Sequence, residues 1–171
     1  MQQQSRRIVV MRHAKAEHAA ATDLERALLE QGREAAAEVG SWLAARGIRP
    51  DHALVSAAAR TRQTWEALAD AAGWVVEADV DRGLYTAGPE TALDLMRSTP
   101  AEADTLVVVG HNPTIAYLAQ MLDDGEGDAE ASNEMAMGYP AGAATVMEYD
   151  GAWADLGAGT ARVMAFHVGR G

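Results

Sequence analysis

The chain contains no cysteine. That absence excludes a disulfide-stapled scaffold, a cysteine-based zinc or iron–sulfur site, and any enzyme with a thiol nucleophile, a thiol-based phosphatase included. No apolar run approaches the roughly 18 residues that a membrane-spanning helix needs. The first residues, MQQQSRR, also lack the apolar segment of a secretory signal. We therefore expect a cytoplasmic protein with no membrane partner.

Basic residues are scarce in this chain. Lys and Arg number 14 against 25 Asp and Glu, which gives a formal net charge of −11. Nucleic acids and anionic membranes both attract basic surfaces, so we expect neither as the main partner. The simplest interpretation of the negative charge is solubility.

Short β-branched runs alternate with helical patterns along most of the 171 residues. Residues 8–11 and 106–109 are continuous apolar runs, which is typical of strands buried on both faces of a parallel sheet. Residues 53–55 and 75–76 predict shorter strands. Apolar residues at helical spacing predict three helices, on Ala36, Val39, Trp42 and Leu43 (ending at Gly47), on Trp65, Leu68, Ala69 and Ala72, and on Ile115, Leu118, Ala119 and Leu122.

This alternation predicts an α/β fold, a three-layer sandwich with a mostly parallel central sheet and helices on both faces. Residues 145–149 and 162–168 predict a C-terminal antiparallel hairpin added to that sheet. The acidic stretch 123–134, DDGEGDAEASNE, has no period, and we expect it to be a mobile surface loop. With 49% hydrophobic residues, the chain can form one domain over residues 1–171.

Polar residues follow three of the predicted strands, at the point where each strand ends. Arg12 and His13 follow the first strand, His111 follows the strand at 106–109, and Arg60 opens the helix after the strand that ends at Ser56. In open α/β sheets the ligand lies beyond the carboxyl ends of the strands. If these strands are neighbours, two imidazoles and two guanidinium groups converge on one small volume.

That combination of side chains suits a phosphoryl group. Guanidinium groups match phosphate oxygens and can offset charge in the transition state. Neutral imidazole is a competent nucleophile toward phosphorus. Asn112 and Pro113 predict an N-cap followed by proline at the first helical position, which would direct a helix N-terminus at the same site.

Two other interpretations fit part of this pattern. Two histidines could bind a metal ion, but the neighbouring arginines would repel it and no third ligand is evident, so we expect no metal and no cofactor. Ser56 could be a nucleophile, but the G-x-S-x-G turn is absent. A structural role for Ser56 in the turn before Arg60 is the simpler expectation.

Three motifs together resemble the histidine phosphatase superfamily, the phosphoglycerate-mutase-like group. They are VMRHA at 10–14, LVSAAARTRQT at 54–64 and VVGHNP at 108–113. The short length and the tail YPAGA…VMEYDG resemble its small SixA-type phosphohistidine phosphatase branch. The resemblance runs from about residue 8 to residue 168.

The resemblance implies roles for individual residues. His13 would be the nucleophile that becomes phosphohistidine, Arg12 and Arg60 would bind the phosphate, and His111 would complete the pocket. Arg26, in TDLERAL, stands where small members often keep an arginine near the phosphate, although a solvated charge is an equal expectation. Asn112 is expected on the substrate-binding side of the same pocket.

The chain departs from the family pattern at two places. Ala14 replaces the glycine that commonly follows the nucleophile, which is tolerable if that backbone does not need a positive φ. No clear general acid is present in RGLYTAGPET at 82–91, where Tyr85 stands where an acid would be expected. Glu90 and Glu17 are the candidates, and Glu90 is more simply explained as a first-turn helix acid.

The sequence thus predicts a metal-independent phosphatase that acts through a covalent phosphohistidine intermediate. An alkoxide leaving group needs a proton, whereas the imidazole of phosphohistidine can be protonated before it leaves. The lack of an acid therefore favours phosphohistidine on a protein as the substrate. The alternatives are a small phosphomonoester, such as a nucleotide or sugar phosphate, and a catalytically weak phosphate-binding module.

Overall fold

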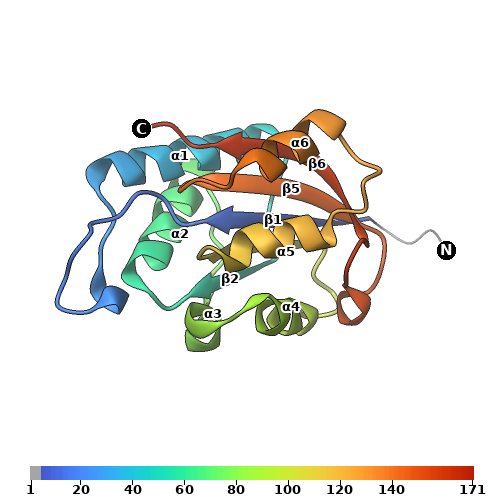
Figure 1. The fold of residues 1–171 in the computed structure, drawn as a ribbon, viewed down its shortest axis with the longest axis horizontal. Helices are drawn as coiled ribbons and strands as arrows, with labels where there is room; N and C mark the ends of the chain where they lie inside the picture. Colours follow the sequence, from blue (N-terminus) through green and yellow to red (C-terminus); the bar gives the residue numbers. More distant parts are fainter. Residues whose placement is uncertain (1–4) are drawn as a thin grey trace.

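A computed structural model describes residues 5–171 and is built on one six-stranded sheet with helices on both sides (Figure 1). The strand order is β3-β2-β4-β1-β5-β6. The strands are β1 (Arg6–Arg12), β2 (His52–Ser56), β3 (Asp79–Asp81), β4 (Thr105–Gly110), β5 (Ala143–Tyr149) and β6 (Ala161–Val168). β1 to β4 pair in parallel, and β5 runs antiparallel to both β1 and β6. The predicted α/β class, mostly parallel sheet and C-terminal antiparallel pair are confirmed.

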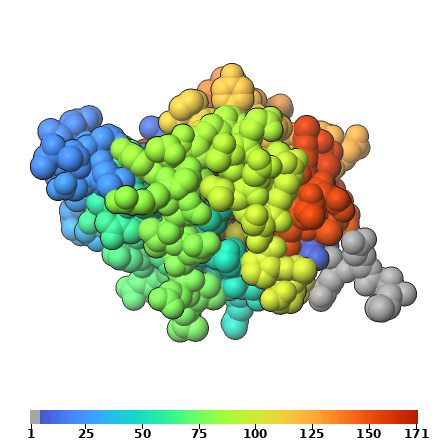
Figure 2. Space-filling view, turned by 90° about the horizontal axis from the view of Figure 1, so that it is seen from below, coloured from blue at the N-terminus to red at the C-terminus, as the bar shows by residue number. Residues whose placement is uncertain are grey.

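The helices divide between the two faces of this sheet. They are α1 (Glu30–Ala45), α2 (Ala59–Ala72), α3 (Arg82–Thr86), α4 (Pro89–Arg97), α5 (Thr114–Leu122) and α6 (Ala129–Met137), with short 3-10 turns η1 (Asp23–Glu25) and η2 (Trp153–Asp155). α1 and α2 pack on one face, and the other four helices pack on the opposite face. Figure 2 shows the segment of α3 and α4 covering one side of the molecule, with the segment near residue 20 at one end.

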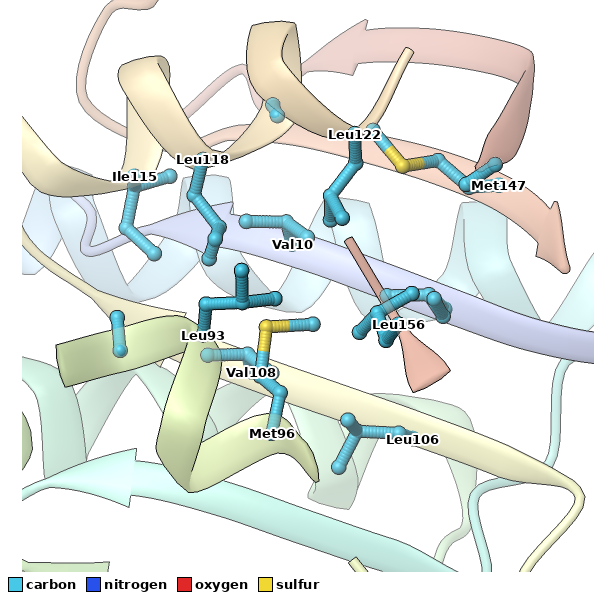
Figure 3. Close-up of a cluster of buried hydrophobic side chains, with 14 of the residues drawn as sticks. Val10, Leu93, Met96, Leu106, Val108, Ile115, Leu118, Leu122, Met147 and Leu156 are labelled. Atoms are coloured by element: carbon cyan, nitrogen blue, oxygen red, sulfur yellow. The ribbon is translucent and has the colours of Figure 1, made fainter. Parts of the chain in front are cut away.

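Alternation along the strands explains why both faces are covered. Val10 and Val108 belong to the hydrophobic cluster beneath α4 and α5, which Figure 3 shows in close-up. Their neighbours Val9 and Val107 belong to the cluster beneath α1 and α2. Because successive side chains point to opposite faces, a continuous apolar run fills two cores at once. The continuous runs in the sequence therefore predicted these central strands correctly.

The three predicted helices are present with ends close to those expected. α1 ends at Ala45, and Gly47 follows with φ +77°, a left-handed conformation that glycine adopts without strain. α2 and α5 cover the other two predicted segments. In the described part of the chain, no helix is long and apolar enough to cross a membrane.

The strand predicted at residues 75–76 is wrong. Val75 is 98% exposed and lies in a loop, and the edge strand β3 forms later, at Asp79–Asp81. Two apolar residues in a row are too few to specify a strand. The residues that pair with β2 are instead Asp79, Val80 and Asp81.

The acidic stretch 123–134 is only partly a loop, which corrects the expectation of a mobile segment. α6 begins at Ala129, and the Asp128 carboxylate accepts a hydrogen bond from the Ala131 backbone N–H at 2.9 Å. Ala131 and Met135, four residues apart, are buried against the sheet. The second of these residues lies outside the acidic stretch, which is why the stretch alone showed no helical period.

The packing of α1 on α2 depends on a close approach at Gly40. A Cβ at Gly40 would collide with the Leu68 backbone carbonyl of α2. We expect Gly40→Ala to lower the free energy of unfolding by about 1–3 kcal/mol, although alanine is the better helix former. Urea denaturation should show the loss, whereas Ser41→Ala at the next, exposed position should leave stability nearly unchanged. Equal stability of both variants would contradict this account of the helix pair.

Candidate active site

Three adjacent strands bring the predicted polar residues to one edge of the sheet. β4 pairs with β1 on one side and with β2 on the other, so all three carboxyl ends lie side by side. Arg12 ends β1 and His13 follows it, His111 follows β4, and Arg60 lies in the first turn of α2. The His13 and His111 ring centroids are 5.4 Å apart. The structure thus brings these four residues together as the sequence predicted.

The His13 imidazole is fixed in one tautomer. Its Nδ1 lies 2.7 Å from the Ala14 carbonyl oxygen, which can only accept, so Nδ1 carries the proton. Nε2 then bears a lone pair and makes no hydrogen bond within residues 5–171. Burial, together with smaller contributions from the positive charges of Arg60 and Arg12, lowers the pKa of His13 to about 4. The ring is therefore neutral at pH 7 and presents a free nucleophilic nitrogen.

Alanine is accommodated at position 14 because its backbone does not need a positive φ. No residue other than glycine has a positive φ in residues 5–171. Ala14 is fully buried against Leu28 and Ala36. Its N–H donates to the Thr64 hydroxyl of α2 at 3.1 Å, which ties the segment after His13 to that helix.

His111 is oriented by Ser56, a residue for which the sequence suggested only a role in the turn. The Ser56 Oγ lies 2.7 Å from His111 Nε2, while its contact with the Ala58 N–H is longer, at 3.5 Å. Burial lowers the pKa of His111 to about 3, and Arg60 contributes in the same direction. Ser56 is fully buried and its hydroxyl has no other acceptor within residues 5–171, so we assign it as the hydrogen-bond donor to Nε2, which leaves the single proton of the neutral ring on Nδ1.

Three buried side-chain nitrogens in this cluster have no hydrogen-bond partner. They are Arg12 Nε, Arg60 Nε and His111 Nδ1, and no other buried side-chain nitrogen or oxygen in residues 5–171 is left unpaired. An unpaired buried donor is costly, and most such groups in proteins find a partner. Donors from two guanidinium groups and one imidazole, next to His13, fit a ligand that carries several acceptor oxygens. A phosphoryl group is such a ligand.

Asp23 is a site residue that the sequence analysis missed. Arg60 donates from Nη1 to the Asp23 carbonyl oxygen at 2.8 Å and from Nη2 to Asp23 Oδ2 at 3.0 Å. Arg26 Nε donates to Asp23 Oδ1 at 2.9 Å, and the Tyr85 hydroxyl donates to Oδ2 at 2.6 Å. The carboxylate thus holds the outer end of the Arg60 guanidinium and leaves the Nε edge free.

Asp23 is ionised in this arrangement. The Tyr85 hydroxyl, with further donors from Arg60 and Arg26, holds the pKa of Asp23 well below its usual range. Asp23 therefore has no proton to give at neutral pH. The one sequence signal for this residue was its position three residues before Arg26, a spacing that allows an ion pair within a helical turn.

Arg26 lies at the rim of the cluster. Besides Asp23, it donates from Nη1 to the Glu17 carbonyl oxygen at 2.8 Å, and its charge is close enough to lower the pKa of His13. Together with Arg12 and His13 it lines a cavity of about 570 Å³. The structure thus places Arg26 beside the other predicted site residues.

Asn112 precedes α5 rather than capping it in the predicted register. The helix begins at Thr114, with Pro113 at the N-cap position, and Asn112 Oδ1 accepts from the Ala116 N–H at 3.2 Å. Asn112 Nδ2 donates to the Tyr139 carbonyl oxygen, which also accepts from Arg12 Nη1. Asn112 and Arg12 are therefore linked through one carbonyl group that the sequence did not identify.

The two candidate acids stand apart from the cluster. Glu90 is exposed in the first turn of α4, which agrees with the helix-acid interpretation. Glu17 meets Arg26 through its backbone carbonyl, and its carboxylate makes no hydrogen bond or ion pair with Arg12, His13 or His111. Within residues 5–171, no group of three or more His, Asp or Glu side chains is placed to hold a metal ion.

Known proteins share both the sequence and this architecture. Residues 8–85 match the model of the histidine phosphatase superfamily, branch 1. The uncharacterised protein Rv1276c of Mycobacterium tuberculosis H37Rv is 35% identical over 162 residues, which cover 94% of this chain and 100% of the relative. The chain belongs to the histidine phosphatase superfamily.

Solved structures place the chain more closely within that superfamily. A protein of Nakamurella multipartitia, described as a "putative phosphohistidine phosphatase SixA", matches with a TM-score of 0.85 and 34% identity over 97% of both chains. A protein of Agrobacterium tumefaciens with the same assignment matches at 0.79 and 30% identity, over 95% of this chain and 97% of that chain. The SixA-type branch and the enzyme class, a phosphatase, are thereby confirmed.

The protonation of the two imidazoles can be checked by NMR titration. We expect His13 and His111 to protonate near pH 4 and pH 3, because burial and Arg60 disfavour the charged rings. Unfolded histidine has a pKa of about 6.5, so stability is lost as the pH falls from about 6.5 towards 4 for His13 and towards 3 for His111. Arg60→Gln should raise both pKa values. Titration of both rings near 6.5 in the folded protein would contradict the assignment.

The role of Asp23 can be tested by kinetics. Asp23→Ala should lower kcat/KM for an aryl phosphate by about tenfold to a hundredfold, because the Arg60 guanidinium loses the carboxylate that orients it. Glu25→Ala is the matched control, since Glu25 lies in the same 3-10 turn and accepts a hydrogen bond only from Thr22. Wild-type activity in Asp23→Ala, with the fold intact, would show that Arg60 needs no such support.

Proposed function

We propose that this protein is a metal-independent phosphatase that acts through a covalent phosphohistidine on His13, with phosphohistidine of a protein as its substrate. The observation that carries the proposal is the set of unpaired buried nitrogens on Arg12, Arg60 and His111 beside the free Nε2 of His13. The three nitrogens suit the oxygens of a phosphoryl group, and Nε2 suits attack on its phosphorus.

The first step forms a bond between His13 Nε2 and phosphorus while the bond from phosphorus to the leaving group breaks. The Nδ1 proton of His13, held on the Ala14 carbonyl, stabilises the positive charge that develops on the ring. Arg12, Arg60 and the Nδ1–H of His111 stabilise the charge on the transferring oxygens. In the second step, water attacks phosphorus, the bond to Nε2 breaks, and inorganic phosphate leaves.

The lack of a proton donor supports phosphohistidine as the substrate. Asp23 is ionised, and within residues 5–171 the carboxylates of Glu17 and Glu90 make no hydrogen bond or ion pair with the cluster. An alkoxide leaving group without a general acid forfeits about a hundredfold to ten-thousandfold in rate. The imidazole of phosphohistidine can take its proton from water before it leaves. The protein would therefore hydrolyse ordinary phosphate esters more slowly.

Two alternatives are kept. A small phosphomonoester would fit the same phosphoryl site, and the SixA-type relatives do not separate the two substrate classes. A phosphate-binding module without catalysis would need the arginines but not His13, and the fixed tautomer of His13 argues against it. We also propose a cytoplasmic location, for which the sequence features described above are the only support.

A trapping experiment tests the covalent step. After brief mixing with a ³²P-labelled phosphohistidine peptide in the presence of a chelator, we expect acid-labile, alkali-stable label on His13. His13→Ala should carry no label, and its turnover rate should fall by about a thousandfold or more. His52→Ala is the control, because His52 begins β2 at the opposite end of that strand and faces Asp79.

The same preparation separates the alternatives. Faster turnover of the phosphohistidine peptide than of a panel of nucleotide and sugar phosphates supports the protein substrate, and the reverse order selects the small phosphomonoester. Full activity in His13→Ala, or complete dependence on a divalent ion, would overturn the mechanism. Binding of phosphate with no label and no turnover would leave only the binding module.

A further inference from the structure

The cavity beside His13 continues beyond the phosphoryl site. The cavity of about 570 Å³ that His13 and Arg12 line shares Lys15, Gln31 and Ala141 with a second cavity of about 340 Å³. Arg170 lines the far end of the second cavity. The two cavities therefore adjoin at these residues, and we refer to them together as the groove that runs from His13 along the start of α1 towards the C-terminus.

This groove is positively charged in an otherwise acidic protein. Its walls hold Arg12, Lys15, Arg26 and Arg170, and no aspartate or glutamate lines either cavity. The whole chain has 25 acidic residues and 14 basic ones. Arg26 is paired with Asp23, and the positive charge that the other three cations add to the groove favours an anionic ligand.

Lys15 is one of two cations of this groove whose side chains have no partner within residues 5–171. Arg26 is paired with Asp23, and Arg12 donates to the Tyr139 carbonyl and faces the phosphoryl site. Lys15 is the one lysine in the sequence. Its ammonium makes no ion pair or hydrogen bond within residues 5–171. The Arg170 side chain is likewise unpaired in that part of the chain.

The backbone under Lys15 is held firmly. The Lys15 carbonyl accepts from the Leu29 N–H at 3.0 Å, and Ala16 forms a β-bridge with Leu28. Gly32 of α1 packs directly on that carbonyl, and a Cβ there would collide with it. The base of the side chain is thus fixed two residues from His13, while its flexible stem lets the ammonium follow an anion in the groove.

We propose that Lys15 forms a second-anion subsite, with Arg170 at its outer end, for a carboxylate or phosphate group carried by the leaving group of the substrate. This inference rests on the proposed function, because it assumes that the phosphoryl group lies at His13. It adds that the substrate carries a second negative charge beyond the phosphoryl group. An acidic neighbour of a phosphorylated residue and a second acid group on a small phosphomonoester share this chemistry.

A matched pair of non-hydrolysable probes tests the subsite without turnover. Propylphosphonate and 3-phosphonopropionate differ in that a methyl group becomes a carboxylate, and calorimetry gives the affinity of each. We expect the wild-type protein to prefer the carboxylate by about fivefold, the size of a partly exposed ion pair. Lys15→Met should abolish that preference. Arg49→Met is the control, since it removes one exposed cation that lines a different cavity and should keep the preference.

A second arm identifies the source of the anion. The KM is measured for two phosphohistidine peptides, one with aspartate and one with alanine beside the phosphohistidine. The ratio of the two KM values is then compared between the wild-type protein and Lys15→Met. If only the peptides show a Lys15-dependent preference for the acidic neighbour, the subsite is supported with a polypeptide as the ligand. If the phosphonates show a Lys15-dependent preference for the carboxylate, the subsite is supported for small acids. No preference in either pair, or a preference that survives in Lys15→Met, would overturn the subsite. Failure of the covalent mechanism would appear separately, as missing label on His13 with phosphonate binding unchanged.

Discussion

The parallel pairing of β1, β4 and β2 is the constraint on which the site depends. Arg12, His13, His111 and Arg60 lie at the carboxyl ends of these strands or in the segments that follow them, and the pairing of β4 with both neighbours brings those ends to one edge. Buried side chains on both faces fix the register, because a slip of one residue would exchange the two hydrophobic faces of a strand. The position of His13 relative to His111 and Arg60 therefore follows from the packing of the core.

Burial gives the polar residues at this edge their chemical character. It keeps the imidazoles of His13 and His111 neutral, and the nearby arginines act in the same direction. It also leaves donors on Arg12 and Arg60 without partners, so the folded protein holds a set of groups that an oxyanion would satisfy. Burying these donors costs free energy during folding. In return the donors are already in place when the substrate binds, which is the preorganisation that phosphoryl transfer requires.

Asp23 and Lys15 divide the charge around this core in different ways. The Asp23 carboxylate pairs with both Arg60 and Arg26 and is itself held by Tyr85, so the positive charge on that side of the site is partly compensated. Within the described residues Lys15 has no such counter-ion, and its side of the groove remains cationic. The charge around the site is therefore unevenly distributed, although the whole chain is acidic. On one side Asp23 holds Arg60 and Arg26 in place, and on the other side Lys15 is open to an anion.

The sequence by itself determined the strand–helix alternation, the central strands and the four residues Arg12, His13, Arg60 and His111, because continuous apolar runs and strand-end motifs are local signals. The edge strand and α6 were missed where the apolar residues were too few or lay outside the stretch considered. Only the tertiary structure decided the contacts of Asp23, Ser56 and Tyr139. These residues reach the site from segments far apart in the chain, and their hydrogen bonds depend on distances that no local pattern encodes.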